Sequence, residues 1–216
     1  MPDASSIADL RQHYAHATLD EATALADPLA QFGVWFAEAQ AAGTHEPNAM
    51  ALATVSAEGR PSVRTVLLKG IDARGLSFFT NLESRKAEDL TAVPYAAVVF
   101  WWPPVERQVR VEGRVERVDD AEADAYFASR PRGSRLGAWA SPQSRPLESR
   151  AALDARLAEV AARFPTETVA RPPFWGGYRL VPDRYEFWQG RADRLHDRLE
   201  YRLDGPGGWV IARLGP

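Results

Sequence analysis

The sequence contains no cysteine, and this absence removes several kinds of chemistry at once. A chain without thiols forms no disulfide, has no thiolate nucleophile and offers no cysteine ligand to a metal. Histidine is also scarce, because His13, His16, His45 and His196 are the only four and lack the spacing of metal ligands. We therefore expect no metal site.

Long apolar runs and an excess of one charge are missing as well. No stretch approaches the roughly 20 apolar residues that cross a bilayer. The N-terminus carries Asp3, Asp9 and Arg11 where a signal peptide would be apolar. The net charge of −3, from 26 basic and 29 acidic residues, argues against non-specific nucleic-acid binding. These features predict a soluble, cytoplasmic protein.

Several common catalytic motifs are also absent. The chain has no P-loop, no glycine-rich dinucleotide-binding turn and no Ser/His/Asp signature. It does have 216 residues, 45% of them hydrophobic, which is enough for one domain with a sizeable core and an added arm. Seven tryptophans, several beside charged residues, indicate a flat ligand or a large interface.

Short apolar segments separated by Gly, Pro and Asp predict a mainly β fold with flanking helices. Consecutive strands with short turns favour a small antiparallel barrel, which leaves few exposed edges. The pattern predicts strands over 49–55, 62–69, 76–80, 95–102, 105–118, 177–181, 184–189, 199–203 and 209–214.

Helix signals lie between these strands and at the N-terminus. Asp27 as N-cap and Pro28 in the first turn begin a helix that ends at Gly43. Further helices are expected after Ser84, over 119–129, and from about 144 to 164, with a short one around 7–14. We divide the chain into an arm or lid, residues 1–26, and a barrel domain, residues 27–216.

The segment from Arg64 to Lys86 contains the first candidate binding site. It reads as a strand with Arg64 and Lys69 at its ends, a turn over 70–75, a second strand and a helix start. Arg85 and Lys86 fall in that helix's first turn, where the helix dipole disfavours cations. Free backbone N–H groups and two cations suit a bound phosphate. The alternative is a solvated basic rim on a hairpin.

A second basic cluster follows the 119–129 helix. Tyr126 and Arg130 are four residues apart and would lie on one helix face, and the turn over 130–135 adds two arginines and Ser134. These residues form either a second phosphate clamp or a solvated surface loop.

A third group lies between the late strands. Arg194, His196 and Arg198 alternate, so in an extended segment they would face the same way, close in sequence to Trp188. One histidine on a strand is more often structural than catalytic, but three alternating cationic or titratable groups beside a tryptophan favour a site.

Taken together, these motifs resemble the pyridoxamine 5′-phosphate oxidase family. The resemblance runs from about Leu10 to Pro216, and its many ordered motifs make it specific where each one alone is not. They are Arg64-Thr65-Val66-Leu67-Leu68-Lys69, Phe79-Thr80-Asn81, Ser84-Arg85-Lys86, Glu106-Arg107-Gln108-Val109, Ser129-Arg130-Pro131, Gly137-Ala138-Trp139, Phe174-Trp175-Gly176-Gly177, Glu186-Phe187-Trp188-Gln189-Gly190 and Arg194-Leu195-His196-Asp197-Arg198.

The resemblance implies a fold, a cofactor and a reaction. The family has an FMN-binding split β-barrel, works as a homodimer and binds FMN at the dimer interface. It oxidises pyridoxamine and pyridoxine 5′-phosphates to pyridoxal 5′-phosphate with O₂, releasing hydrogen peroxide, and ammonia from the amine. This chemistry belongs to vitamin B6 biosynthesis and needs no strong protein acid or base, because the flavin accepts the hydride.

The resemblance also assigns residues. Substrate contacts would come from Arg11, Tyr14, Lys69, Tyr126, Arg130, Ser134, Arg194, Leu195 and His196, with Arg194 and His196 over the reacting ring as the catalytic pair. FMN contacts would come from Arg64, Thr65, Val66, Leu67, Leu68, Lys69, Phe79, Thr80, Arg85, Lys86, Gln108, Gln143, Ser144, Trp188 and Arg198.

One departure and two rival functions remain open. Phe79 stands where the family often has tyrosine, so a polar contact to FMN from that side chain is in doubt. The first rival is an FMN oxidase of another pathway, of the phenazine type, which would not need Lys69, Tyr126, Arg130 and Ser134 together. The second is a split barrel that binds flavin or haem without turnover, which would not need Arg194 and His196.

Overall fold

The computed structural model describes residues 14–205 and 208–216. Its contacts divide these residues into two compact units. Unit 1 contains the described residues up to Pro47, together with Val99–Val111 and Asp183–Pro216; unit 2 contains Asn48–Val98 and Glu112–Pro182. The proposed boundary between residues 26 and 27 stays a prediction, and the expected helix around 7–14 lies almost wholly outside the described residues.

Strands dominate the chain, as expected for a mainly β fold with flanking helices, and this prediction is confirmed. The sheet has the order β2-β1-β5-β6-β7-β4-β3, and β8 pairs with both β7 and β9. The strands are β1 Ala49–Val55, β2 Pro61–Leu67, β3 Gly70–Asp72, β4 Gly75–Asn81, β5 Tyr95–Trp102, β6 Arg107–Arg117, β7 Trp175–Gln189, β8 Asp197–Asp204 and β9 Gly208–Arg213.

Three of the described helices, α2, α4 and α6, begin where a short polar residue caps them. Asp27 accepts a hydrogen bond from the Leu29 amide, Asp119 from the Glu122 amide and Ser149 from the Ala152 amide, which satisfies N–H groups that a helix start leaves free. The α-helices are α2 Pro28–Ala41, α3 Arg85–Ala92, α4 Asp120–Ser129, α5 Arg132–Ala140 and α6 Arg150–Arg163, with short 3₁₀ turns η1 Pro103–Val105 and η2 Ala192–Arg194.

Three local predictions were wrong. The expected turn over 70–75 contains a strand, β3, which pairs with β4. The two expected strands over 177–189 form a single strand, β7, because Pro182 sits in it without ending it. The basic segment over 130–135 was expected to be a turn, but Pro131 caps a helix that begins at Arg132; proline before a first helical turn loses no hydrogen bond there.

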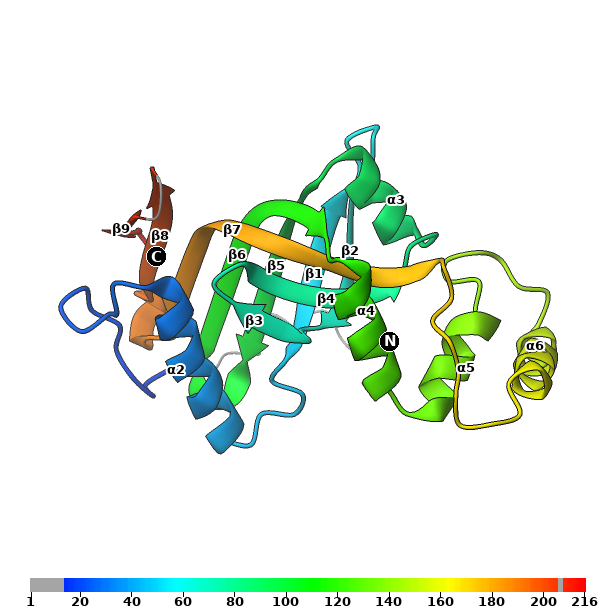
Figure 1. Ribbon diagram of the computed structural model, residues 1–216. Coiled ribbons are helices and arrows are strands. Elements are labelled where there is room, and N and C mark those ends of the chain that lie inside the picture. The colour runs from blue at the N-terminus through cyan, green and yellow to red at the C-terminus, as the bar shows by residue number, and fades with distance from the viewer. Residues whose placement is uncertain (1–13, 206–207) are drawn as a thin grey trace, which may run out of the picture. The chain divides into compact units, whose positions relative to one another are not determined.

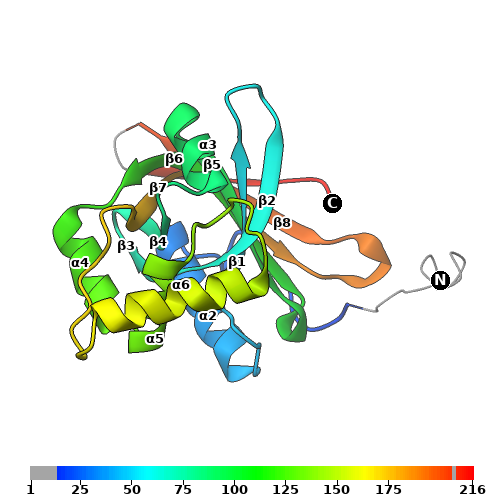
Figure 2. The same cartoon turned by 90° about the vertical axis from the view of Figure 1, so that its right-hand side faces the viewer.

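In unit 2, α3 lies beside the β1–β2 hairpin, and α5 and α6 lie side by side (Figures 1 and 2). β4 pairs antiparallel with the first half of β7, which places Phe78 opposite Tyr178 and Asn81 opposite Trp175. A buried cluster of Phe127, Leu136, Val169 and Trp175 holds the helical part against the start of β7. This arrangement puts α4, α5 and the β4–α3 junction at the site described below.

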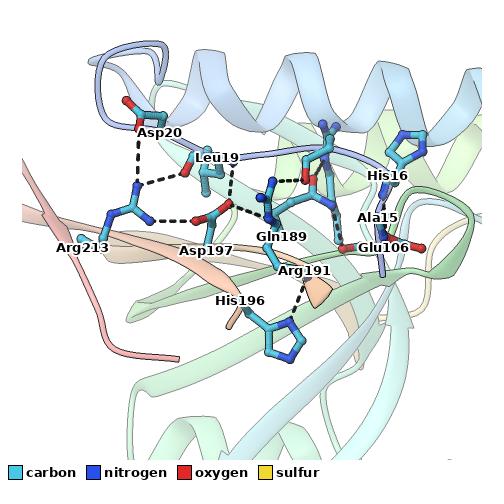
Figure 3. A network of polar contacts seen from close by, with 12 residues as sticks. Ala15, His16, Leu19, Asp20, Glu106, Gln189, Arg191, His196, Asp197 and Arg213 are labelled. Carbon is cyan, nitrogen blue, oxygen red and sulfur yellow. Dashed lines mark hydrogen bonds and ion pairs between the residues drawn. The ribbon is translucent and has the colours of Figure 1, made fainter. Parts of the chain in front are cut away.

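In unit 1, the N-terminal segment is tied to the last strands by a polar network (Figure 3). Arg213 on β9 donates to the Leu19 carbonyl at 3.1 Å and to Asp197 at 2.9 Å, and Asp197 also accepts from the Leu19 amide. The carboxylate of Glu106 accepts the backbone N–H groups of Ala15 and His16, both at 2.9 Å. The described part of the predicted arm is therefore packed on unit 1.

Two features are absent from the described residues. No helix within residues 14–205 or 208–216 is long and apolar enough to cross a membrane. Within the same residues, no three His, Asp or Glu side chains gather closely enough to hold a metal ion.

Candidate active site

A cavity of about 960 Å³ lies in unit 2, lined by strands β2 and β4, the start of α3, and residues from α4 to the segment after α5. The predicted cofactor and substrate residues of unit 2 all lie in its wall, with one exception, Leu68, which is buried outside it. Those in the wall are Arg64, Thr65, Val66, Leu67, Lys69, Phe79, Thr80, Arg85, Lys86, Tyr126, Arg130, Ser134, Gln143 and Ser144.

Arg64 is held against β1 by neutral oxygens. Its guanidinium donates to the Leu52 carbonyl at 3.1 Å, to Thr54 Oγ1 at 2.7 Å and to Ser62 Oγ at 2.8 Å. Asp89 lies 3.7 Å away, and burial outweighs this ion pair, so the pKa of Arg64 is lowered from its usual value. Arg64 is a fixed donor at the cavity wall.

Lys86 is a buried cation with neutral partners. Its Nζ donates to Thr80 Oγ1 at 3.0 Å, Ser84 Oγ at 3.2 Å and Gln143 Oε1 at 2.8 Å. Burial, followed by the positive charge of Arg64, lowers the pKa of Lys86 to about 8. In the described part of the chain no carboxylate pairs with Lys86, so a bound anion would supply the missing charge.

Ser84 and Arg85 complete this group at the start of α3. Ser84 occupies the N-cap position, but its hydroxyl donates to the Asn81 carbonyl and does not cap the helix. The first-turn N–H groups therefore lack a side-chain acceptor, beside the exposed Arg85 and the buried Lys86. A phosphate fits such a helix start.

Arg130 ends α4 in a different part of the cavity wall. Its guanidinium lies over the ring of Trp175, 4.8 Å from the centroid, and its Nη1 is buried without a hydrogen-bond partner. Burial lowers the pKa of Arg130. A buried, unpartnered guanidinium nitrogen costs free energy unless something accepts its hydrogen bond.

Tyr126 and Phe79 stand next to Arg130. The two rings stack at 4.2 Å between centroids with an interplanar angle of 24°, and Phe79 stacks on Trp175 at 5.5 Å and 9°. The ring of Phe79 therefore packs between neighbours of the assigned substrate group without offering a hydroxyl. Ser134, on α5, and Lys69, after β2, line the same cavity and are exposed.

The other predicted residues belong to unit 1. His196 accepts a hydrogen bond on Nδ1 from the Arg191 amide at 3.1 Å, as Figure 3 shows. Its ring lies 4.5 Å from that of Trp188 and 5.8 Å from that of Tyr14. Burial and the charge of Arg194 lower the pKa of His196, which favours the neutral ring. Because Nδ1 accepts the hydrogen bond from the Arg191 amide, the ring proton is on Nε2, which can donate.

The expectation that Arg194, His196 and Arg198 alternate along one extended segment was wrong. Asp193 and Arg194 have positive φ angles of 56° and 62°, because the chain turns through η2 before β8 begins at Asp197. Arg194 and Leu195 are exposed on this turn. Their proximity to His196 comes from the turn and not from strand alternation.

Arg198, on β8, is the most firmly held of the unit 1 residues. Its Nε and Nη2 donate to both carboxylate oxygens of Glu186 at 3.1 and 3.0 Å, and Nη1 donates to the Gly215 carbonyl at 2.7 Å. These bonds raise the pKa of Arg198. Gln108 is half-buried on β6, and Arg11 lies outside the described residues.

Residues that the sequence did not assign also line the cavity: Ser62, Val63, Asn81, Pro131, Gly137, Ala138, Ser141 and Trp175. Most flank assigned positions, so their presence follows from proximity along the chain. Trp175 does not, because it lies 45 positions after Arg130. Its only sequence signal was its place in the Phe174-Trp175-Gly176-Gly177 motif.

Comparisons with known proteins agree with this geometry. Residues 36–164 match a family model described as pyridoxamine 5′-phosphate oxidase, and residues 175–216 match one described as the pyridoxine 5′-phosphate oxidase C-terminal dimerisation region. Pyridoxine/pyridoxamine 5′-phosphate oxidases from Bordetella petrii and Burkholderia multivorans are 60% and 59% identical over 211 and 214 residues, covering 98% of this chain and 100% of each relative.

Solved structures show the same fold. PhzG from Burkholderia lata, in complex with tetrahydrophenazine-1-carboxylic acid, is 35% identical with a TM-score of 0.86, over 92% of this chain and 98% of that one. A pyridoxamine 5′-phosphate oxidase-related, FMN-binding protein from Nostoc punctiforme shares 22% identity and a TM-score of 0.68, over 85% and 96%. The split-barrel prediction is thereby confirmed, and the chain belongs to the pyridoxamine 5′-phosphate oxidase family of oxidoreductases.

Proposed function

We propose that this protein oxidises pyridoxamine 5′-phosphate and pyridoxine 5′-phosphate to pyridoxal 5′-phosphate, with FMN as cofactor and O₂ as final acceptor. The observation that carries the proposal is one cavity with two separate groups of cationic side chains. Lys86, Arg64 and Arg85, whose charges act on one another, form one group; Arg130, at the end of α4, belongs to the other, to which we assign Lys69. Two phosphate-bearing ligands need two such groups. The names of relatives about 60% identical over nearly the whole chain support the same reaction.

The first group fits the phosphate of FMN. Lys86 is buried among three neutral oxygens, and the N–H groups of the first turn of α3 lack a side-chain acceptor. A phosphate monoester would supply the negative charge and the acceptors together. Arg64, Thr80 and Gln143 are then further phosphate or flavin contacts, and FMN fits better than FAD, whose phosphates are not terminal.

The second group fits the phosphate of the substrate. Arg130 offers a buried donor without a partner, and Tyr126 and Ser134 bring hydroxyls to the same cavity. A phosphorylated ligand satisfies all three, whereas an unphosphorylated one leaves Nη1 of Arg130 buried without an acceptor. This requirement favours a pyridoxine-type phosphate as substrate.

The chain's own part in the reaction is to bind and orient. Bound FMN would supply a hydride acceptor for the substrate carbon that bears the amine or alcohol and a route for both electrons to O₂, which leaves as hydrogen peroxide. The alcohol gives the aldehyde directly, whereas the amine gives an imine that water hydrolyses to the aldehyde and ammonia. Holding the substrate by its phosphate lowers the entropy cost of reaching that geometry. Arg194 and His196, whose neutral ring donates through Nε2, are assigned to the pyridine ring of the substrate.

The test is direct. The purified protein is denatured, and the released cofactor is identified by chromatography. The native protein then receives pyridoxamine 5′-phosphate in air, and pyridoxal 5′-phosphate formation and oxygen uptake are followed. We expect FMN, and aldehyde and peroxide in equal amounts. Release of FAD or of no flavin, or a flavoprotein that leaves the substrate unchanged, would refute the proposal.

The similarity to PhzG supports a second candidate, an oxidase acting on a reduced phenazine. Such a substrate is not phosphorylated and would not use Arg130, Ser134 and Lys69 together. Assaying tetrahydrophenazine-1-carboxylic acid beside pyridoxamine 5′-phosphate separates the two, and we expect turnover of the phosphate ester alone.

A further inference from the structure

Trp175 lines the cavity although it lies far along the chain from the other residues of the wall. The family resemblance assigns it no role. It is buried, with 5% of its surface exposed, at the first position of β7. Its ring contacts two residues assigned to the substrate phosphate: Arg130, 4.8 Å from the ring centroid, and Tyr126, 6.1 Å between centroids at an angle of 14°. A side chain that touches both is placed to set their positions.

The contact with Arg130 replaces an ion pair. In the described part of the chain no carboxylate pairs with Arg130, and burial lowers its pKa. Its Nη1 is buried and unpartnered. An aromatic face attracts a guanidinium through the quadrupole of the ring without neutralising its charge. Trp175 therefore fixes the direction of the guanidinium and leaves its charge for an incoming anion, which a carboxylate would not do.

The contact with Tyr126 belongs to a group of three near-parallel rings, Tyr126, Phe79 and Trp175, in which each ring stacks on the other two. Phe79 lies against both Tyr126 and Trp175, with interplanar angles of 24° and 9°. Opposite Phe79 in the sheet is Gly177, where a Cβ atom would come within 2.7 Å of the Phe79 ring. The glycine gives that ring its room, and the stack then aligns Tyr126 with Trp175.

The backbone of Trp175 is held on both its amide and its carbonyl. Its amide donates to the Pro172 carbonyl at 3.0 Å, and its carbonyl accepts from Arg171 Nη1 at 2.7 Å. Arg171 also donates to Asp120 and Asp124 at 2.8 and 2.5 Å, and both are on α4, the helix that carries Tyr126 and ends at Arg130. Arg171 thereby links the start of β7 to α4.

From this geometry we infer that Trp175 is a positioning residue for the substrate phosphate, acting through Arg130 and Tyr126 and not by direct contact with the reacting atoms. The inference rests on the proposed function. Its consequence is specific: loss of the ring weakens binding of the phosphorylated substrate and leaves FMN binding and the rate of the bound complex nearly unchanged.

The main experiment compares steady-state kinetics of the FMN-loaded wild type with Trp175→Leu and Trp175→Phe. We expect the KM for pyridoxamine 5′-phosphate to rise about thirtyfold in Trp175→Leu, the size of a desolvated cation–π contact. In Trp175→Phe, which keeps a smaller ring, it rises about two- to threefold. Flavin content and kcat stay near those of the wild type in both. An unchanged KM in a folded Trp175→Leu protein overturns the inference.

A matched control separates positioning from general loss of structure. Trp139 also carries an arginine over its ring, Arg163 at 4.5 Å, and packs on the same buried cluster, but it does not line the cavity. Trp139→Leu is therefore expected to lower the thermal unfolding midpoint without changing KM. If both variants raise KM equally, Trp175 is only structural and the inference fails.

A double variant tests whether Trp175 acts on substrate binding through Arg130. If Trp175 acts through Arg130, the KM increase of Arg130→Ala/Trp175→Leu falls well short of the product of the two single increases. Increases that multiply overturn the proposed route. The wild-type measurement distinguishes the two proposals. An inactive wild type refutes both the proposed function and the inference. An active wild type together with an unchanged KM in Trp175→Leu refutes the inference alone.

Discussion

At the scale of single residues, Lys86 shows how a buried charge without a counter-ion favours binding of an anionic ligand. Its three partners are oxygens of Thr80, Ser84 and Gln143, which accept hydrogen bonds but carry no charge. Burial, followed by the positive charge of Arg64, lowers the pKa of Lys86 to about 8. The cost of keeping Lys86 protonated is recovered when a phosphate binds, so burial here strengthens the dependence of the site on its ligand.

Replacing Lys86 with methionine tests this assignment. Lys86→Met keeps most of the side-chain volume and removes the charge, so FMN should bind about 1.5–3 kcal/mol more weakly, the range for a hydrogen bond to a charged group. Titration of the flavin-free protein with FMN, followed by flavin fluorescence, measures the effect. Arg130→Ala is the control and should bind FMN normally; an unaltered affinity in Lys86→Met would remove Lys86 from the cofactor site.

The lowered pKa also predicts a pH dependence. Bound phosphate favours protonated Lys86, so FMN binding takes up a proton once the free protein has lost it, and the FMN dissociation constant should rise as pH increases above about 8. Lys86→Met should show a flatter profile between pH 7 and pH 9. In the flavin-free protein, the pKa of Lys86 is about 8 when the chain is folded and near 10.5 when it is unfolded, so the unfolded chain binds more protons in that window. The contribution of Lys86 to the free energy of unfolding should therefore increase as pH rises.

Replacing Arg130 and replacing Arg194 should change the steady-state kinetic constants in different ways. Arg130→Ala loses a charged donor to the substrate phosphate, so kcat/KM should fall about ten- to a hundredfold, mostly through KM, with flavin content intact. Arg194→Ala, assigned to the pyridine ring, should lower kcat as well, because a misplaced reacting centre costs rate. Loss of flavin in Arg130→Ala, or unchanged constants in Arg194→Ala, would show that the assignment of that residue is wrong.

At the scale of elements, the approach of β6 to β7 in unit 2 depends on one glycine. A Cβ atom on Gly113 would lie 2.1 Å from the Val181 carbonyl oxygen, a backbone atom that cannot rotate away. The neighbouring strand passes close because the side chain is missing, and β7 continues through Pro182 to Gln189. Gly113 is therefore a site of close backbone approach.

Gly113→Ala should consequently destabilise the protein, by about 1–3 kcal/mol as for other overpacked sites. Gly33→Ala is the matched control, since Gly33 lies in α2, is exposed and has open space where its Cβ would be. That change should stabilise by about 0.5–1 kcal/mol because alanine favours helix. Urea unfolding of both variants measures the difference, and equal stabilities would show that the strands can separate without cost.

At the scale of the whole molecule, we propose a homodimer. Residues 175–216, which contain β7, β8 and β9, match a C-terminal dimerisation region. Large apolar side chains are exposed on β9 and also on β2 and β5, including Val210, Val63, Tyr95 and Trp101. A monomer gains nothing from leaving such residues in water.

The FMN-loaded protein should therefore sediment as a dimer across the concentration range of the assay. Sedimentation velocity, with absorbance recorded at protein and flavin wavelengths, shows whether both signals move together at the mass of two 23.9 kDa chains. A flavin-loaded species at the mass of one chain would contradict the proposal.

The sequence by itself determined the features that short-range chemistry controls. Asp27 before Pro28 marks the start of α2, and Asp119 with Glu122 marks the start of α4, because a cap acts within one helical turn. Strand β1 appeared with its observed bounds from an apolar, β-branched run. The family itself was recognisable because its motifs keep their order along the chain, whatever their positions in space.

Only the tertiary structure decided which of these residues meet. Gln143 reaches Lys86 and Trp175 reaches Arg130 across 57 and 45 positions of sequence, and those contacts depend on how β4, β7 and the helices pack. The local errors have the same cause: β3 forms because β4 offers a partner, and Arg194 lies on a turn and not on a strand. Burial, which sets the pKa of Lys86, is likewise a property of the packed chain, because neighbouring sequence does not specify what covers a side chain.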